Sequence, residues 1–221
     1  MGDCQNEDLR VDFDSRLKLK FVGSQVTSDA GLLAYRELDE ALGLTEMGAD
    51  VLTDSRQGRN KQHQLVPLLR QSIYSRLAGY EDVNDAERLC VDPTMRHVVG
   101  GRASQPEKQA ASTSEVGRFE TGILSTKSNL TALMNLSGRW IDNVHRRRPL
   151  KELILDLDSS VSETYGRQQG TAYNGHFECL CYHPLFLFNR HGDLESAMLR
   201  RGNKASAKYW RNVLLPVIER Y

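Results

Sequence analysis

Hydrophobic positions recur at intervals of three and four residues over the first two thirds of the chain, which is the spacing of a buried helix face. Ser28 stands where a side chain can cap the first of these helices, and Gly43 follows where that helix can end. A short strand is expected ahead of it, over Leu17–Val22. The helices predicted from this spacing cover residues 28–42, 61–79, 82–90, 93–99, 113–121 and 126–144.

The spacing changes near residue 148. From there, short apolar runs bounded by Gly, Asn and Pro are typical of strands. Arg190–Asp193 is expected to turn a hairpin between the last two runs. Strands are therefore predicted over residues 150–158, 176–189 and 194–199, followed by a helix over 204–220.

This order of elements predicts an α+β protein in three parts. A polar N-terminal segment covers residues 1–24, a helical region covers 25–148, and a region with a sheet covers 149–221. Three strands and one helix leave one face of a sheet bare. We therefore expect either that the chain is cut short, so that covering elements are missing, or that the helical region covers the bare face.

Composition supports a folded protein and narrows its partners. Of the 221 residues, 39% are hydrophobic and 26% are charged, which is enough for a core. The 29 basic and 29 acidic side chains cancel, so nucleic acid can be bound only through a local basic patch. There is no run of about 18 apolar residues and no secretory signal. With four cysteines and no export signal, the protein is expected in the reducing cytoplasm, away from membranes.

Asp156 and Asp158 are the strongest candidates for chemistry. They end an apolar run that is expected to be a strand, in which alternate residues share a face, so both side chains should point the same way. An unpaired carboxylate at the edge of a core is costly to bury, and Mg²⁺ is a common partner for one or two such carboxylates. The alternative is that the strand ends in water and both acids are solvated.

Basic side chains cluster at two places, around residues 146–148 and over 190–211. A basic turn that opens a helix can bind phosphate through its side chains and through free backbone N–H groups. The alternative is an ordinary solvated surface. The residues predicted to contact DNA are Arg146, Arg147, Arg148, Arg200, Arg201, Lys204, Lys208 and Arg211.

The sequence gives less support to a zinc site, a nucleotide-binding site or a serine hydrolase site. The set His176, Cys179, Cys181 and His183 has the residue types of a zinc site. Alternate positions on a strand lie about 6–7 Å apart, however, whereas structural zinc prefers cysteines on turns, so the spacing favours buried thiols. Phosphate-binding and dinucleotide-binding glycine motifs are absent, as is the serine hydrolase motif, and no small-molecule cofactor is expected.

Several motifs occur in the order found in insertion-sequence transposases of the DDE class. Nearly the whole chain resembles the "thirteen-eighty" insertion-sequence group, and the ordered set of motifs is more specific than any one of them. The helical stretches 26–44 and 114–120 are also similar to that group. The matching motifs are Asp156-Leu157-Asp158, the turn with Gly166, Gln168, Gly170 and Asn174, the run Cys181-Tyr182-His183-Pro184-Leu185, and the turn Leu199-Arg200-Arg201-Gly202-Asn203.

The resemblance implies an RNase H-like core with the order strand, strand, strand, helix, strand. Family members use two aspartates and a glutamate to hold two metal ions, Mg²⁺ or Mn²⁺, which activate water and then a DNA 3′-hydroxyl. By the family's Asp-x-[Ser/Thr] pattern, the first acid is Asp158, which precedes Ser159-Ser160, and Asp156 is the second choice. The implied partners are DNA at transposon ends and a second copy in a homodimer, with residues 25–148 binding DNA or shaping that dimer.

The sequence departs from the family because it has no counterpart of the second aspartate or of the glutamate. It therefore resembles the front part of a transposase, with an incomplete RNase H-like core of three strands and one helix. We expect residues 1–221 alone neither to cleave nor to join DNA. Two alternatives stay open: a nuclease with the same core, and a DNA-binding or degenerate interaction fragment without catalysis.

Overall fold

The computed structural model describes residues 9–19, 27, 29–57, 61–101, 108–166 and 168–221. The chain divides into two compact units, Met1–Asn129 and Leu130–Tyr221. This division falls inside helix α7 (Lys127–Arg147), before the change of spacing near residue 148. No helix of the described ranges is long and apolar enough to cross a membrane.

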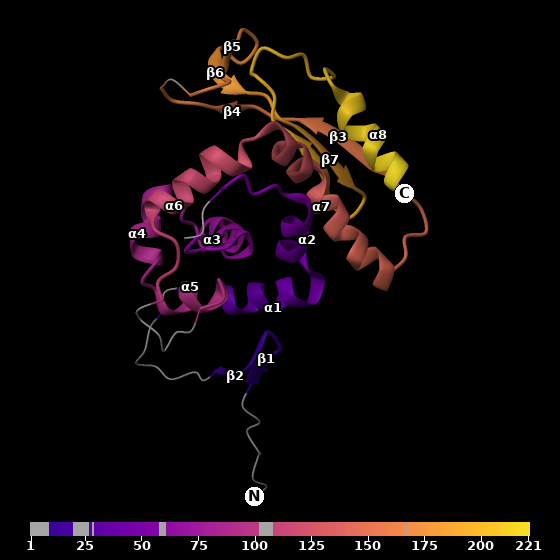
Figure 1. Ribbon diagram of the computed structural model, residues 1–221. Coiled ribbons are helices and arrows are strands. Elements are labelled where there is room, and N and C mark those ends of the chain that lie inside the picture. Colours follow the sequence, from indigo (N-terminus) through magenta and orange to yellow (C-terminus); the bar gives the residue numbers. More distant parts are fainter. Residues whose placement is uncertain (1–8, 20–26, 28, 58–60, 102–107, 167) are drawn as a thin grey trace, which may run out of the picture. The chain divides into compact units, whose positions relative to one another are not determined.

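The first unit is mainly helical and also contains a β-hairpin (Figure 1). The hairpin lies in the N-terminal segment 1–24, where one strand was expected over Leu17–Val22; its second strand begins earlier, at Asp14, and is described as far as Leu19. The described elements are β1 (Leu9–Val11), β2 (Asp14–Leu19), α1 (Leu32–Leu42), α2 (Leu44–Val51), α3 (Leu65–Leu77), η1 (Val83–Asp85), α4 (Ala86–Leu89), α5 (Pro93–Val98), α6 (Thr113–Arg118), the π-helix η2 (Phe119–Leu124) and the first turn of α7.

The spacing of apolar residues predicts most of these helices. α1 begins later than expected, at Leu32, and Ser28, the predicted cap, lies outside the described residues. Gly43 ends α1 as predicted: its φ of 73° is left-handed, and its N–H donates to the Asp39 carbonyl at 2.6 Å. α2 follows Gly43 directly and was not predicted, because one turn-forming residue is enough to separate the two helices.

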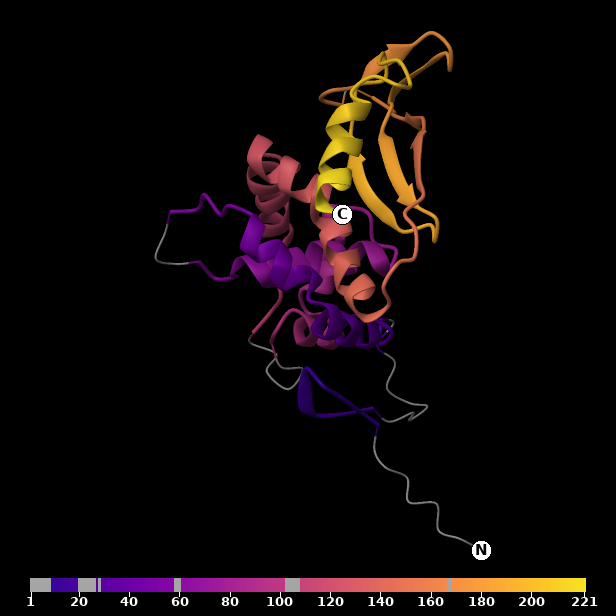
Figure 2. The ribbon, with the colours of Figure 1, turned by 90° about the vertical axis from the view of Figure 1, so that its right-hand side faces the viewer.

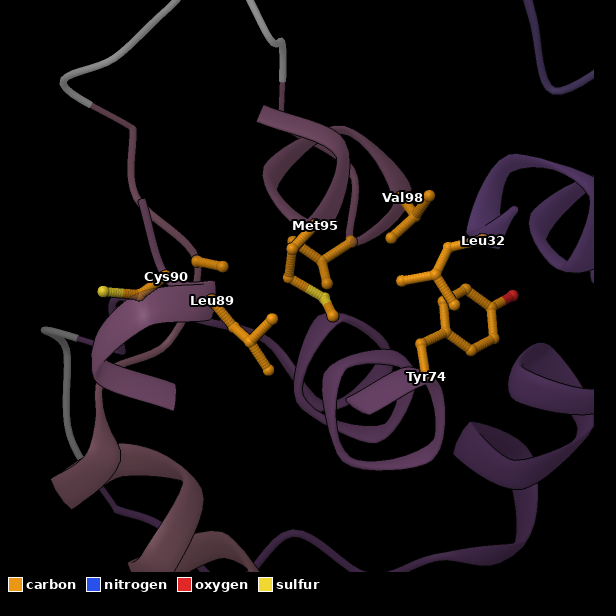
Figure 3. Packing of buried hydrophobic residues seen from close by; sticks show 8 residues of the cluster. Leu32, Tyr74, Leu89, Cys90, Met95 and Val98 are labelled. Carbon is orange, nitrogen blue, oxygen red and sulfur yellow. The ribbon is translucent and has the colours of Figure 1, made fainter. Parts of the chain in front are cut away.

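The core of the first unit joins helices that are distant in sequence (Figure 3). Leu32 of α1, Tyr74 of α3 and Leu89 of α4 meet Met95 and Val98 of α5, and all five are at most 2% exposed. A fully buried aliphatic side chain contributes about 1.5–3 kcal/mol, so this cluster is a main source of stability for the unit.

The second unit combines helices with two three-stranded antiparallel sheets, β3-β7-β8 and β4-β6-β5. Figure 2 shows α8 lying along the first sheet. Together with the first unit, this makes a mixed helix and sheet protein, as the α+β prediction requires. The elements are the rest of α7, β3 (Leu155–Ser159), β4 (Ser162–Glu163), β5 (Ala172–Asn174), β6 (Cys179–Tyr182), β7 (Leu185–Asn189), β8 (Leu194–Met198) and α8 (Trp210–Arg220).

Two predictions for the second unit are wrong in detail. The single strand expected over 176–189 is two strands in two sheets, β6 and β7, separated at His183-Pro184. Pro184 has no N–H to donate to a strand ladder, which favours a break there. The last helix begins at Trp210 instead of Lys204, because Tyr209 has a left-handed φ of 67° that a continuous helix does not allow.

α8 covers one face of the sheet β3-β7-β8. Leu185 and Leu187 of β7 pack with Val213 and Val217 of α8, and all four are at most 1% exposed. Leu155 and Leu157 of β3 lie against this cluster. The apolar alternation of β3 therefore points its leucines into the core.

A buried ionic network joins β8 to both helices of the unit. Glu195 of β8 is fully buried and accepts hydrogen bonds from Asn189 Nδ2 and Tyr221 Oη, each at 2.9 Å. Arg220 forms an ion pair with Glu195, and its Nε lies 3.2 Å from an Asp142 carboxylate oxygen on α7. Burial and the Glu195 charge raise the pKa of Tyr221 to about 12. A buried charge needs such partners, so the network fixes how these elements meet.

Candidate metal site and nucleic-acid interface

Asp156 and Asp158 lie side by side on the face of β3 that α8 does not cover. β3 pairs with β7 so that Asp156 is opposite Phe188 and Asp158 is opposite Phe186. Both aspartates are exposed, whereas the alternate residues Leu155 and Leu157 are half-buried against the core. The predicted sharing of one face by the two acids is therefore confirmed, and their exposure agrees with the alternative in which the strand ends in water.

The chemistry of the pair suits a hard cation. Asp158 Oδ1 accepts a hydrogen bond from the Ser159 N–H at 2.8 Å, which orients that carboxylate. In the described part of the chain, neither Asp156 nor Asp158 forms an ion pair with a basic side chain. Exposed carboxylate oxygens that no cationic side chain neutralises are the ligands that Mg²⁺ and Mn²⁺ prefer.

Within the described ranges, no larger metal cluster accompanies this pair. Among the residues that the structure describes, no three His, Cys, Asp or Glu side chains are placed to hold one ion. Cys179 and Cys181 are free thiols, of which Cys181 is fully buried and Cys179 is half-buried. His183 instead bonds through Nδ1 to the carbonyl oxygen of Lys204, at 2.8 Å.

The first basic cluster, Arg146, Arg147 and Arg148, lies at the C-terminal end of α7. All three side chains are exposed. The C-terminal end of a helix, where carbonyl groups are unpaired, favours positive charge. These arginines therefore also stabilise the end of α7. The exposure of the cluster leaves these cations accessible to a phosphate backbone.

The second basic cluster lies mostly ahead of the last helix, although a helix was predicted over 204–220. Arg201, Lys204 and Lys208 lie in turns ahead of α8, and only Arg211 is on the helix. Arg201, Lys208 and Arg211 are exposed, and Lys204 is half-buried. The Lys208 amine lies 5.2 Å from the ring centre of Tyr209, and Arg211 lies 5.4 Å from that of Trp210. Cations beside exposed aromatic rings suit contact with nucleic acid.

Arg200 is buried, unlike the other residues that were predicted to contact DNA. It is only 4% exposed, and burial lowers the pKa of its guanidinium. Its Nε donates to the His183 carbonyl at 2.7 Å, and its Nη1 donates to the Ser206 and Lys208 carbonyls at 2.8 and 2.7 Å. These bonds shape the loop before α8 and use the donors that a phosphate would need.

Several motif residues that have no assigned chemistry hold this region together. Asn174 Nδ2 donates to the Gly202 carbonyl at 2.7 Å, which ties the β5–β6 turn to the loop after β8. A side chain at Gly202 would collide with the carbonyl oxygens of Ala172 and Cys181. The motifs contain these residues, but spacing alone gave no sign of their structural roles.

Comparison with known protein families places a match over most of the chain. The profile of the family described as transposase DDE domain group 1 matches residues 9–221. No curated protein matches the chain, and no solved structure does. The matched range includes the acidic pair and both basic clusters.

Proposed function

The chain belongs to the transposase DDE domain group 1 family, and from this premise we propose that it serves DNA transposition of an insertion sequence. In this proposal the second unit supplies the start of an RNase H-like site, with Asp158 as the first catalytic acid and Asp156 beside it. The observation that carries the proposal is the exposure of both carboxylates on one face of β3, inside the range that the family profile matches.

The order of elements in the second unit supports an RNase H-like core. β3, β7 and β8 form an antiparallel sheet, and α8 follows in sequence and covers one face of it. This is the order strand, strand, strand, helix that the resemblance implies. The two acids lie on the opposite face, where DNA can reach them without displacing α8.

Transposases of the DDE class use divalent metals, and Asp156 and Asp158 would hold Mg²⁺ or Mn²⁺ here. Such an ion supplies Lewis-acid stabilisation of the charge that develops on a phosphodiester. Mg²⁺ usually keeps several waters and shares its coordination between one or two carboxylates and substrate phosphates. We therefore expect this pair to bind the ion best when DNA is present.

The two basic clusters would hold the DNA backbone. Arg146, Arg147 and Arg148 form one contact region, and a second consists of Arg201, Lys204, Lys208 and Arg211. Arg200 would act as a positioning residue, because its donors hold the loop that carries Lys204 and Lys208. The region 25–148 would bind transposon ends or assemble a homodimer.

The metal proposal can be tested by electron paramagnetic resonance of free Mn²⁺. We expect the protein with a DNA duplex to bind more Mn²⁺ than the duplex alone. Asp158→Asn should weaken the protein-dependent part about tenfold or more, which corresponds to ~1.4 kcal/mol. Glu163→Gln is the matched control, because Glu163 is an exposed carboxylate on a different sheet.

Equal Mn²⁺ binding by the Asp158→Asn variant and the unchanged protein would contradict the metal proposal. The same samples with Mg²⁺ should leave the DNA intact, because no third carboxylate joins the pair in the part of the chain described. Nicking of the duplex that disappears in Asp158→Asn would instead favour a nuclease with the same core.

A further inference from the structure

A second concave site lies away from the acidic pair, in the second unit. It is a pocket of about 410 Å³ between the β5–β6 turn and the loop after β8. This volume falls in the range of about 300–1,000 Å³ that is usual for small-ligand pockets. The side chains that matter most for its chemistry are Tyr173, His176, Phe177, His183 and Lys204.

The walls of this pocket are fixed by internal hydrogen bonds. Asn174 Oδ1 accepts from the backbone N–H groups of His176 and Phe177, at 2.9 and 3.3 Å, while its amide nitrogen donates across to Gly202. Glu178, at the end of the turn, has a left-handed φ of 55°, a conformation that is costly for a residue with a side chain. The turn is therefore built into one shape before any ligand arrives.

His183 offers an unused polar atom in this pocket. Its side chain lines the pocket although the residue is only 4% exposed. Nδ1 lies 2.8 Å from the Lys204 carbonyl oxygen, and because a carbonyl can only accept, Nδ1 carries the proton. In the neutral ring this leaves Nε2 as an acceptor, and Nε2 has no hydrogen-bond partner among the described residues. A ligand with an N–H group would supply the missing donor.

The remaining lining is aromatic and basic. Phe177 is 40% exposed, and its ring meets His183 edge-on with the centroids 5.7 Å apart. Lys204 contributes an ammonium group, and the lining residues that the structure describes include no carboxylate. Aromatic rings beside a cation are the combination on which proteins stack unpaired bases and hold their phosphates.

The pocket is linked through the backbone to the end of β3 that carries Asp158. The Ser160 N–H donates to the Pro184 carbonyl at 3.2 Å, and Ser159 pairs with Leu185. His183 directly precedes Pro184, so the pocket wall is continuous with the strand connection beside the acidic pair. A DNA strand held at Asp158 would have its neighbouring nucleotides near this pocket.

We propose that the pocket holds one unpaired nucleotide of the bound DNA. The base would lie against Phe177 and donate to His183 Nε2, and its phosphate would contact Lys204. A base stacked inside a duplex cannot enter a pocket, so the nucleotide must be unpaired or extruded. This inference rests on the proposed function, since it requires that the chain binds DNA.

The test compares three fluorescein-labelled DNA probes by fluorescence anisotropy. They share one duplex, which is blunt, or has a short single-stranded thymidine tail, or has the same tail made of abasic residues. The protein should bind the thymidine tail about tenfold more tightly than the abasic tail, because only the former has a base to stack. Phe177→Ala should remove most of this preference, and Lys204→Gln should weaken binding of both tailed probes relative to the blunt one.

Tyr165→Ala is the matched control, because Tyr165 is an aromatic residue of the same unit that is 84% exposed and does not line the pocket. It should keep the full preference for the thymidine tail. Equal affinity for all three probes, or a preference that survives Phe177→Ala in a variant with an unchanged circular dichroism spectrum, would overturn the pocket proposal and leave DNA binding standing. Failure to bind any probe would overturn the proposed function and this inference with it.

Discussion

Asp39 is an acidic side chain that is buried in the first unit and accepts several hydrogen bonds there. It is a residue of α1, is 6% exposed and pairs with Arg70 of α3. It accepts hydrogen bonds from the Thr45 N–H at 2.8 Å and from Arg70 Nε and Tyr74 Oη, each at 3.2 Å. Burial and the Asp39 charge raise the pKa of Tyr74 well above its ordinary value, so the phenol stays a donor. The spacing of apolar residues gave no sign of this cluster, because its members are polar.

His97 makes the stability of the first unit depend on pH. The residue is 8% exposed, and neither ring nitrogen has a hydrogen-bond partner among the described residues. Burial lowers the pKa of His97 below 6.5, Arg16 and Arg36 lower it further, and Asp14 opposes them. At a pH between the lowered pKa and the ordinary one, His97 therefore binds a proton in the unfolded chain but not in the folded chain.

We expect the free energy of unfolding to be at its full value above about pH 6.5 and to fall as the solution is acidified through that value. His97→Gln should make this part of the pH dependence flatter. Thermal unfolding at about pH 7.5 and about pH 5.5 measures the effect. An equal loss of stability on acidification in both proteins would rule out His97 as its source.

At the scale of elements, the division of the second unit into two sheets depends on a single dipeptide. β6 and β7 are adjacent in sequence but belong to different sheets, with His183-Pro184 between them. The His183 N–H donates to the Arg200 carbonyl at 2.9 Å, so the break is itself hydrogen-bonded. An uninterrupted aromatic run predicts one strand, because hydrophobicity alone does not reveal where a ladder changes partner.

Gly138 decides how closely α7 approaches β8. A Cβ at this position would collide with the Glu195 carbonyl oxygen and with the Arg220 guanidinium. We expect Gly138→Ala to destabilise the protein by about 1–3 kcal/mol, the usual cost of overpacking. Helix propensity alone would predict that Gly138→Ala raises the free energy of unfolding by about 0.5–1 kcal/mol. A loss of stability would therefore show that the close contact outweighs helix propensity.

Gly122→Ala is the control for this prediction. Gly122 also lies in a helical segment, the π-helix η2, and a Cβ there meets no atom within 4 Å. The control should be neutral or stabilising in urea unfolding, while Gly138→Ala unfolds at lower urea. Similar midpoints for the two variants would show that the close contact at Gly138 does not limit stability.

At the scale of the whole molecule, zero net charge means that DNA binding must come from local clusters. Each phosphate contact should contribute about −0.9 to the slope of log affinity against log salt concentration. We expect Arg211→Gln and Lys208→Gln each to weaken binding and to reduce the size of that slope by about 1. Fluorescence anisotropy over a salt series measures both quantities.

Arg16→Gln is the matched control for the charge variants. Arg16 is exposed but already paired with Asp14 at 2.8 Å, so its loss should leave the salt slope unchanged. An affinity for DNA that does not vary with salt, or equal effects of Arg16→Gln and Arg211→Gln, would argue against the proposed interface.

The sequence predicts the helices and the strand faces better than it predicts the contacts between loops. Helical spacing locates α1, α3 and α7, and strand alternation places Asp156 and Asp158 on one face, because both patterns report burial directly. The buried state of Arg200 could not be predicted, since its partners are backbone carbonyls of a loop. The pocket at Phe177 and His183 likewise depends on two turns meeting in space.

The close packing of Gly138, Glu195 and Arg220 has a consequence for how this protein can diverge. The three positions share one small volume. The Glu195 carbonyl oxygen and the Arg220 guanidinium fill the space that a side chain at 138 would need. A larger residue at 138 would meet the backbone carbonyl oxygen of residue 195 whatever side chains stand at 195 and 220, and a shorter residue at 220 would remove the cation that pairs with Glu195. Homologues should therefore keep glycine at 138, and they should exchange the residues at 195 and 220 together, as one inherited pair.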